Sequence, residues 1–118
     1  MTDHTLTITR STHPTGTTLV KVTGELDYHT APELTRAIEE TSFSADDSVV
    51  FDLTDLTYCD STGITVLVIA YQHAQKGGSR LTLAGLNADL MRVFQVVGLD
   101  QIFTFRPTVE QALTHQPS

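Results

Sequence analysis

The segment SVVFDLTDLTYCDSTGITVLVIAY, residues 48–71, decides the fold. Its first part, residues 48–53, is a short apolar and β-branched run, which is typical of a buried central strand. A polar loop then runs to Gly63, and a second apolar segment begins at Ile64 and closes near Lys76–Gly78. Valine and isoleucine favour a strand here, but the length, the preceding cap signals and the crossover that parallel strands require favour a helix. We therefore predict a strand, a loop and a helix.

The residues before this segment predict a hairpin and a helix. Alternating β-branched and polar residues within 6–22 indicate two paired strands, the second of which ends at residues 24–27. Thr30, Pro32 and Glu33 follow as an N-cap, a first-turn proline and a capping-box glutamate. These three signals predict that the first helix begins at Thr30.

The residues after the central segment continue the alternation of strands and helices. A strand is predicted at 80–84, a helix from Asn87 to Gly98, a strand at 101–105 and a short helix within 108–113. The order is ββαβαβαβα, which implies right-handed crossovers between parallel strands. The fold class is α/β, with a mostly parallel sheet of four to five strands, an N-terminal hairpin strand and about four helices.

Composition limits the possible partners. The 118 residues are 40% hydrophobic, which suits one domain over 1–118 with loose ends at 1–4 and 115–118. The formal charge of −7 disfavours nucleic acid and anionic membrane surfaces. The single cysteine, the lack of a signal-peptide pattern and the lack of a 20-residue apolar run predict a cytoplasmic protein without a membrane span.

Two loops hold the candidate functional residues. Residues 24–30 and 58–63 should meet at the carboxyl ends of neighbouring strands. Ser61 lies at or next to the start of the second helix, where a serine usually only caps the backbone. Asp60, Gly63 and the uncharged helix that follows favour a functional role instead. That helix is apolar around most of its circumference, so its outer side is either buried under neighbouring helices or exposed for a partner.

Catalytic and cofactor sites are not expected. Ser61 lacks the Gly-x-Ser-x-Gly elbow, and nothing fixes the tautomer of His29 as its base. Cys59 should be an inert, buried thiol whose pKa the neighbouring Asp60 raises. The histidines and aspartates show no metal-ligand spacing, and no phosphate-binding or dinucleotide motif occurs. We therefore predict neither a metal nor a cofactor.

Four short motifs together carry a resemblance to a known family. They are Gly24-Glu25-Leu26-Asp27, Val50-Phe51-Asp52-Leu53 with Asp60-Ser61-Thr62-Gly63-Ile64, Val97-Gly98-Leu99, and Val109-Glu110-Gln111-Ala112-Leu113. In their order and separations the chain resembles a STAS domain over nearly its whole length, in particular the stand-alone anti-sigma factor antagonists of bacteria. Each motif is weak alone, and the four together are specific.

The resemblance implies a phosphorylation switch. In the family, the anti-sigma factor is a serine kinase that binds ATP itself, and a metal-dependent serine phosphatase reverses its action. The phosphoacceptor carried over to this chain is Ser61. The unphosphorylated antagonist binds the kinase and releases its sigma factor, whereas the phosphorylated form binds poorly. The docking surface implied by the resemblance comprises Gly24, Glu25, Asp27, Asp60, Ser61, Thr62, Gly63 and Ile64.

The chain departs from the family pattern at a few positions, and the sequence leaves several alternative functions open. Thr65 and the pair Tyr58–Cys59 differ from many relatives. Thr65 lies close to the docking edge and so bears on partner identity, and we expect Tyr58 in the core rather than at an interface. The runner-up function is a constitutive STAS interaction subunit of a lipid-transport or stressosome-like complex. A third possible function is that of a module that binds a small ligand or a nucleotide at the loop ends near Asp27 and Ser61. The sigma factor, the kinase, the stimulus, phosphorylation of Thr62 and weak homodimerisation are not decided by the sequence.

Overall fold

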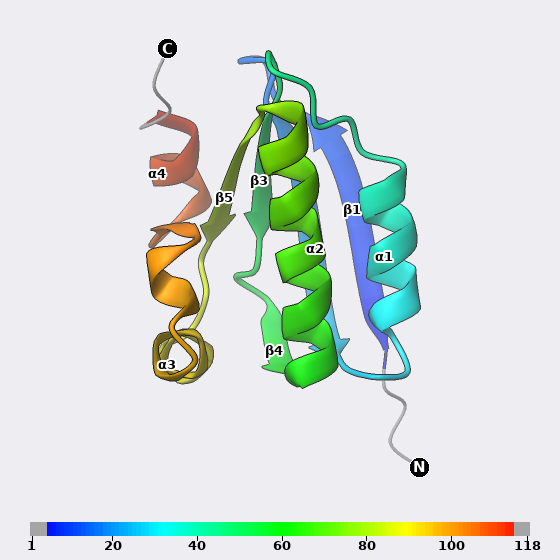
Figure 1. Cartoon of the computed structure of the whole chain (residues 1–118), viewed down its shortest axis with the longest axis vertical. Helices are drawn as coiled ribbons and strands as arrows, with labels where there is room; N and C mark the ends of the chain where they lie inside the picture. The colour runs from blue at the N-terminus through cyan, green and yellow to red at the C-terminus, as the bar shows by residue number, and fades with distance from the viewer. Residues whose placement is uncertain (1–4, 115–118) are drawn as a thin grey trace.

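The computed structural model describes residues 5–114, so the predicted loose ends lie outside the described residues. Figure 1 shows helices packed against a twisted sheet. The strands are β1 (Leu6–Thr12), β2 (Thr18–Leu26), β3 (Ser48–Asp52), β4 (Leu56–Cys59), β5 (Arg80–Ala84) and β6 (Thr104–Arg106). The helices are α1 (Ala31–Glu39), α2 (Ser61–Gly77), α3 (Ala88–Val96) and α4 (Val109–Thr114), with a 3₁₀ turn, η1, at Leu99–Gln101.

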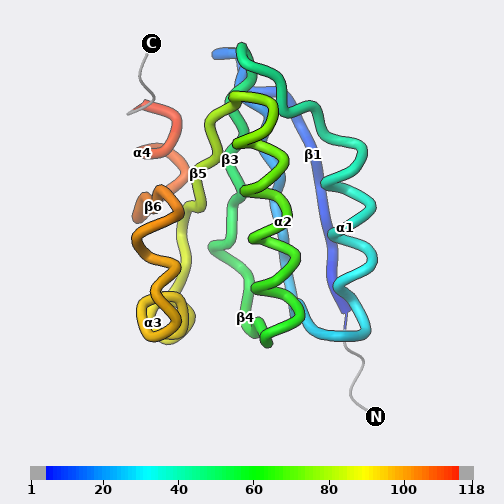
Figure 2. Tube along the Cα trace, in the orientation of Figure 1, coloured from blue at the N-terminus to red at the C-terminus, as the bar shows by residue number. Residues whose placement is uncertain are grey.

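The sheet has the order β1-β2-β3-β5-β6, and β4 pairs with the far end of β2. β1 and β2 form the predicted antiparallel hairpin, and every other pair is parallel. The prediction of an α/β fold with a mostly parallel sheet is therefore confirmed. Figure 2 shows the trace returning after each helix to lay β5 and then β6 at the edge of the sheet.

Two expectations about the elements were wrong. Residues 56–59, predicted as loop, form β4, which raises the strand number of the described chain to six. This strand has only four residues and exposes its two central side chains, so it carries no apolar alternation to recognise. The last strand begins at Thr104 rather than 101, because η1 occupies the preceding residues. Helix α2 begins at Ser61, which agrees with the expected helix start at or next to this residue.

The helices divide between the two faces of the sheet. The main core lies under α1, α2 and α3 and includes Phe51, Leu67 and Phe94, which are fully buried. A second, smaller cluster of Val50, Ala84 and Ala112 lies under α4 on the opposite face. The edge strand β1 exposes most of its residues to solvent. The principal core therefore lies on the face of the sheet that α1, α2 and α3 cover.

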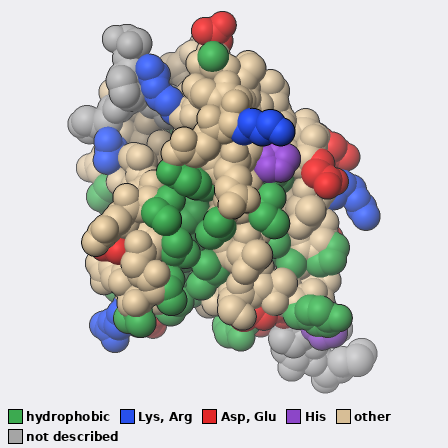
Figure 3. Space-filling view, in the orientation of Figure 1, with side chains coloured by type: hydrophobic (Ala, Val, Ile, Leu, Met, Phe, Trp, Pro, Cys, Tyr) green, Lys and Arg blue, Asp and Glu red, His purple; other side chains and the backbone are tan. Residues whose placement is uncertain are grey.

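The apolar circumference of α2 is mostly covered. Its side toward the sheet and α1 is buried, and several remaining apolar side chains are half-buried. The buried residues are Gly63, Val66, Leu67, Ala70 and Ala74, and the half-buried ones are Ile64, Val68, Ile69 and Tyr71. Figure 3 shows hydrophobic side chains gathered over α2 and between α2 and the column of α3 and α4. No helix within residues 5–114 is long and apolar enough to cross a membrane.

Candidate functional site

The two predicted loops meet at the end of the sheet where α2 begins. Leu26 at the end of β2 pairs with Cys59 at the end of β4, and the Asp60 N–H donates to the Leu26 carbonyl at 3.1 Å. The loop into α1 and the loop into α2 therefore start side by side, at the lower end of the molecule in Figure 1. This confirms the expectation that strand ends would bring them together.

Asp60 is the N-cap of α2 and also joins the two loops. Its Oδ1 accepts a hydrogen bond from the Gly63 N–H at 3.0 Å, which satisfies a donor of the first helical turn. Its Oδ2 accepts from the Tyr28 N–H at 3.2 Å, 32 residues earlier in the chain. One carboxylate thus holds the start of α2 against the loop before α1.

Ser61 is the first residue of α2 and is exposed. Asp60 fills the N-cap position, so Ser61 lies next to the cap, one of the two expected placements, and its hydroxyl does not cap the helix. No residue within 5–114 hydrogen-bonds the Ser61 hydroxyl, and its carbonyl accepts from Thr65 Oγ1 at 2.9 Å. The fold therefore presents this hydroxyl to solvent at the positive end of a 17-residue helix.

Asp27 and Thr30 shape the loop before α1. Asp27 is only 5% exposed, and its Oδ1 accepts from the N–H groups of His29 at 2.9 Å and Thr30 at 3.1 Å. The Thr30 hydroxyl donates to the Glu25 carbonyl at 2.7 Å and accepts from the Asp27 N–H at 2.9 Å. Thr30 is the N-cap residue of α1, as predicted, but its side chain makes no cap hydrogen bond, since its hydroxyl binds the preceding loop instead.

The two motif glycines serve the packing of this end. A Cβ on Gly63 would lie 2.6 Å from Leu26 Cγ and 2.9 Å from Cys59 Sγ, so α2 approaches the ends of β2 and β4 too closely for a side chain. Gly24 has φ +111° at the point where β2 shifts its register, and a Cβ there would lie 2.3 Å from the Thr5 carbonyl oxygen. Gly63 therefore allows the close approach of α2 to the ends of β2 and β4, and Gly24 allows the close approach of β2 to Thr5.

Cys59 is a buried thiol behind Ser61. It is 7% exposed, and its Sγ lies 3.7 Å from the Asp60 carbonyl oxygen. Burial, and to a smaller extent the negative charge of Asp60, together raise the pKa of Cys59 to about 12. The prediction of a buried thiol with a raised pKa is confirmed, and its inertness stays a prediction, because only the thiolate is a strong nucleophile.

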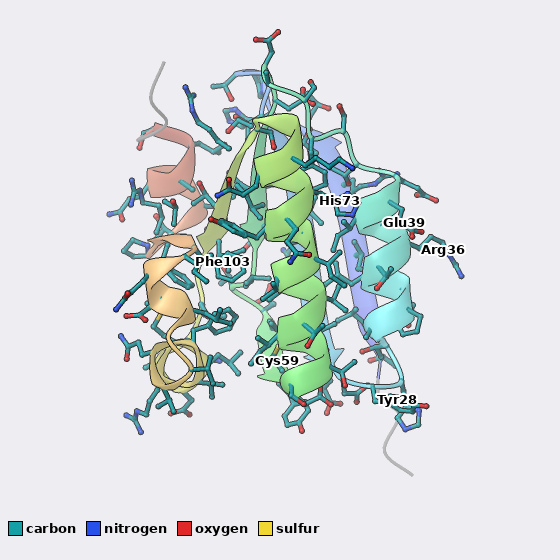
Figure 4. All side chains as sticks on the ribbon, viewed as in Figure 1. Tyr28, Arg36, Glu39, Cys59, His73 and Phe103 are labelled. Carbon is teal, nitrogen blue, oxygen red and sulfur yellow. The ribbon has the colours of Figure 1, made fainter. Side chains whose placement is uncertain are left out.

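The rim of the site carries two exposed tyrosines. Tyr58 is 47% exposed, so the expectation of a core tyrosine is wrong. Tyr28 is 73% exposed and lies beside the start of α1, as labelled in Figure 4. Tyr28 also lines a groove of about 480 Å³ between α1 and α2, together with Thr62 and Val66. Sequence reasoning missed Tyr28, although an aromatic residue next to a helix start in a polar loop was a usable signal.

The remaining predicted docking residues differ in their exposure. Gly24, Glu25, Asp60, Thr62 and Ile64 are half-buried, whereas Asp27 and Gly63 are buried. Within residues 5–114 no group of three metal-ligating side chains comes together. The geometry can therefore offer a partner the Ser61 hydroxyl, with Thr62, Ile64 and Tyr28 around it.

Comparison with known proteins gives consistent similarities. Residues 9–112 match the STAS domain family. An anti-sigma-B factor antagonist of Listeria monocytogenes is 36% identical over 85 residues, which are 72% of this chain and 75% of the relative. The corresponding Bacillus subtilis protein is 34% identical over 83 residues, covering 70% of this chain and 75% of the relative.

Solved structures share the fold. A crystal structure of an anti-sigma factor antagonist from Mycobacterium paratuberculosis has a TM-score of 0.85 and 28% identity, covering 96% of this chain and 95% of that one. The Bacillus cell fate determinant SpoIIAA in its phosphorylated form has a TM-score of 0.70 and 20% identity, covering 92% and 97% respectively. The second similarity concerns the fold alone.

Proposed function

The chain belongs to the STAS domain family, and from that premise we propose that it is an anti-sigma factor antagonist whose partner binding is switched at Ser61. The observation that carries this proposal is the exposed Ser61 hydroxyl, which has no hydrogen bond within residues 5–114 because Asp60 caps α2. A group that the fold does not use is available for modification.

The proposed partner is an anti-sigma factor that is also a serine kinase and binds its own ATP. The Ser61 oxygen attacks the γ-phosphorus, the bond to the bridging oxygen breaks, ADP leaves, and the hydroxyl proton passes to a base of the kinase. A metal-dependent serine phosphatase returns the hydroxyl by hydrolysis. In this role the chain is a substrate and binding protein rather than an enzyme, and it works in the cytoplasm.

The fold should tolerate the phosphate. The modification adds a charge of about −1.5 to −2 at pH 7, and the first turn of a helix offers backbone N–H donors and a positive dipole end to it. Among residues 5–114, no acceptor is hydrogen-bonded to the Ser61 and Thr62 N–H groups. The modification therefore changes the surface charge much more than the shape.

Docking is where the phosphate has its effect. The docking surface proposed here centres on Ser61, Thr62 and Ile64, while the buried Asp27 and Gly63 hold that surface in place. A phosphate would bring its charge next to Asp60, and both would have to lose water when the partner binds. A penalty of a few kcal/mol weakens binding by roughly 100-fold, since each 1.4 kcal/mol is tenfold.

The test uses three baits and one control on a matched background. Affinity capture from the native cytoplasm with wild type and Ser61→Asp identifies the partner, and calorimetry then measures its affinity. Ser61→Ala should bind like wild type, and Ser61→Asp should bind about 100-fold more weakly. Ser11→Asp adds the same charge at an exposed position of β1 and should leave the affinity unchanged.

Two outcomes would reject the switch. Equal affinity of Ser61→Ala and Ser61→Asp for the captured kinase would show that charge at this position does not control docking. Retention of the same transport or scaffold subunits by both baits would favour the constitutive interaction subunit instead.

A further inference from the structure

A cavity of about 540 Å³ lies at the opposite end of α2 from Ser61. It is bounded by the last turns of α2, the start of β5, and α4. β6 pairs with β5 only from Thr82 onward, so the edge of β5 before that residue has no neighbouring strand. Because α2 and α4 pack on opposite faces of the sheet, the gap at this edge stays open between them. Its volume suits a small organic ligand.

The cavity is lined by positive charge in an acidic protein. Arg80 and Arg106 line it, and no aspartate or glutamate among residues 5–114 does. The chain as a whole has 14 acidic and 7 basic residues, so the half-buried Arg106 in a cavity that no described carboxylate lines departs from the overall balance. Arg106 is half-buried, and its Nη1 donates to the Phe105 carbonyl at 3.0 Å, which restrains the guanidinium. An oxyanion is the ligand group that such a lining attracts.

Hydroxyl groups without partners lie in the same lining. The Ser79 Oγ is buried and has no hydrogen bond. Thr82 is 7% exposed, and no residue within 5–114 hydrogen-bonds its hydroxyl, but its oxygen is not fully shielded from solvent as that of Ser79 is. The buried Ser79 hydroxyl without a partner is unfavourable, and a bound oxyanion would supply its missing acceptor. These two side chains are independent of the arginines, yet they call for the same chemistry.

The rest of the lining is apolar. Tyr71, Leu81 and Ala112 border the cavity, as does Ile102, which is 43% exposed. An inorganic ion would leave this apolar part empty. We propose that the cavity binds a small organic oxyanion, a phosphate ester or a carboxylate on an apolar body, with Arg106, Ser79 and Thr82 at the oxyanion.

The proposed ligand site is separate from the docking surface. The 17 residues of α2 place its two ends about 25 Å apart at 1.5 Å per residue. Ligand binding can therefore be measured without the anti-sigma factor, and either proposal can fail without the other.

The experiment is a titration of the ¹⁵N-labelled full chain with three probes that share a benzene ring. Phenyl phosphate carries a phosphate ester, benzoate a carboxylate, and benzyl alcohol no charge. We expect saturable amide shifts at Ser79, Arg80 and Thr82 with at least one anion, which also identifies the oxyanion. No saturation up to about 10 mM with either anion, or equal binding of benzyl alcohol, would overturn the proposal.

Variants test the assigned residues. Arg106→Gln should weaken binding about tenfold or more, whereas Arg92→Gln, on the exposed side of α3, should not change it. Thr82→Val preserves the side-chain volume and should weaken binding severalfold, so it tests the site if Arg106→Gln does not fold. Equal loss of binding in Arg92→Gln, or undiminished binding in both lining variants, would show that the anion is not held in this cavity.

Discussion

At the scale of single residues, three neighbours near the start of α2 have separate tasks. Asp60 caps the helix and joins the two loops, Ser61 faces solvent, and Cys59 is buried behind both. The difference between the last two is a matter of direction: the end of a strand points Cys59 into the core, and the first turn of a helix points Ser61 outward. Their reactivities should differ accordingly.

The Cys59 thiol should resist alkylation in the folded protein. Because its pKa is raised to about 12, the thiolate is the minor form at pH 8, and its fraction grows only as pH rises toward the pKa. We expect reaction with iodoacetamide at pH 8 to be at least about 100-fold slower than for an exposed cysteine of ordinary pKa. Mass spectrometry over time measures the rate, which should rise with pH.

Two controls accompany this labelling. Denaturant should make Cys59 react at the rate of a model thiol. The variant Ser61→Cys should gain one fast-reacting thiol at the exposed helix start, while Cys59 stays slow. Fast labelling of Cys59 in the folded wild type would contradict the described burial.

At the scale of elements, β2 is shared along its length between two parallel neighbours. Its first part pairs with β3 and its last part with β4, and the register shifts between Gly24 and Glu25. Gly24 makes that change with φ +111°, close to the Thr5 carbonyl. The pairing with β4 is what brings the two loops of the site together.

Gly24→Ala should therefore destabilise the protein strongly. The positive φ disfavours any side chain, and the added Cβ would also meet the Thr5 carbonyl oxygen at 2.3 Å. We expect a loss of about 3 kcal/mol or more in the free energy of unfolding, measured by urea denaturation.

Gly16→Ala is the matched control. Gly16 has φ +92° but nothing within 4 Å of its Cβ position, so only the backbone term remains, about 1–2 kcal/mol. Equal losses in the two variants would show that the contact with Thr5 adds nothing.

Most elements followed from sequence patterns, and the exceptions have local causes. Asn87 caps α3 as predicted, with its Oδ1 accepting from the Leu90 N–H at 2.9 Å. Thr108 likewise accepts from the Gln111 N–H at 3.1 Å. β4 was missed because its pairing depends on the register shift at Gly24, a long-range feature that four residues do not encode.

The site was predictable in location but not in the role of each side chain. The rule that loops gather at the carboxyl ends of parallel strands brought Asp60 and Asp27 together. Which side chains of these loops are buried depends on the backbone dihedral angles of the loops, which the sequence pattern does not give. Asp27 accepts hydrogen bonds from the His29 and Thr30 N–H groups and is buried, whereas the side chain of Tyr28 in the same loop is exposed.

At the scale of the whole molecule, the two proposed sites lie at opposite ends of one helix. α2 begins at Ser61 and finishes beside the cavity that Gln75 and Ser79 line. Figure 1 shows α2 running nearly the full height of the molecule in front of the sheet. The distance along it greatly exceeds the screening length of about 8 Å at physiological ionic strength.

Charge at Ser61 should therefore leave the cavity unaffected. We expect Ser61→Asp to bind the anionic probe of the cavity within about twofold of wild type at 0.15 M salt. The same titration of amide shifts measures this. A change of tenfold or more would mean that the helix transmits the charge through a shift of its packing rather than through space.

The capping of α2 by Asp60 also has an evolutionary consequence. Under the proposed switch, selection for folding acts on position 60, whereas selection for signalling acts on position 61, although the two codons are adjacent. A lineage can thus exchange the serine for another acceptor, fix a permanent charge or abandon regulation without first acquiring a compensating mutation in the scaffold. The neighbouring aspartate has no such latitude.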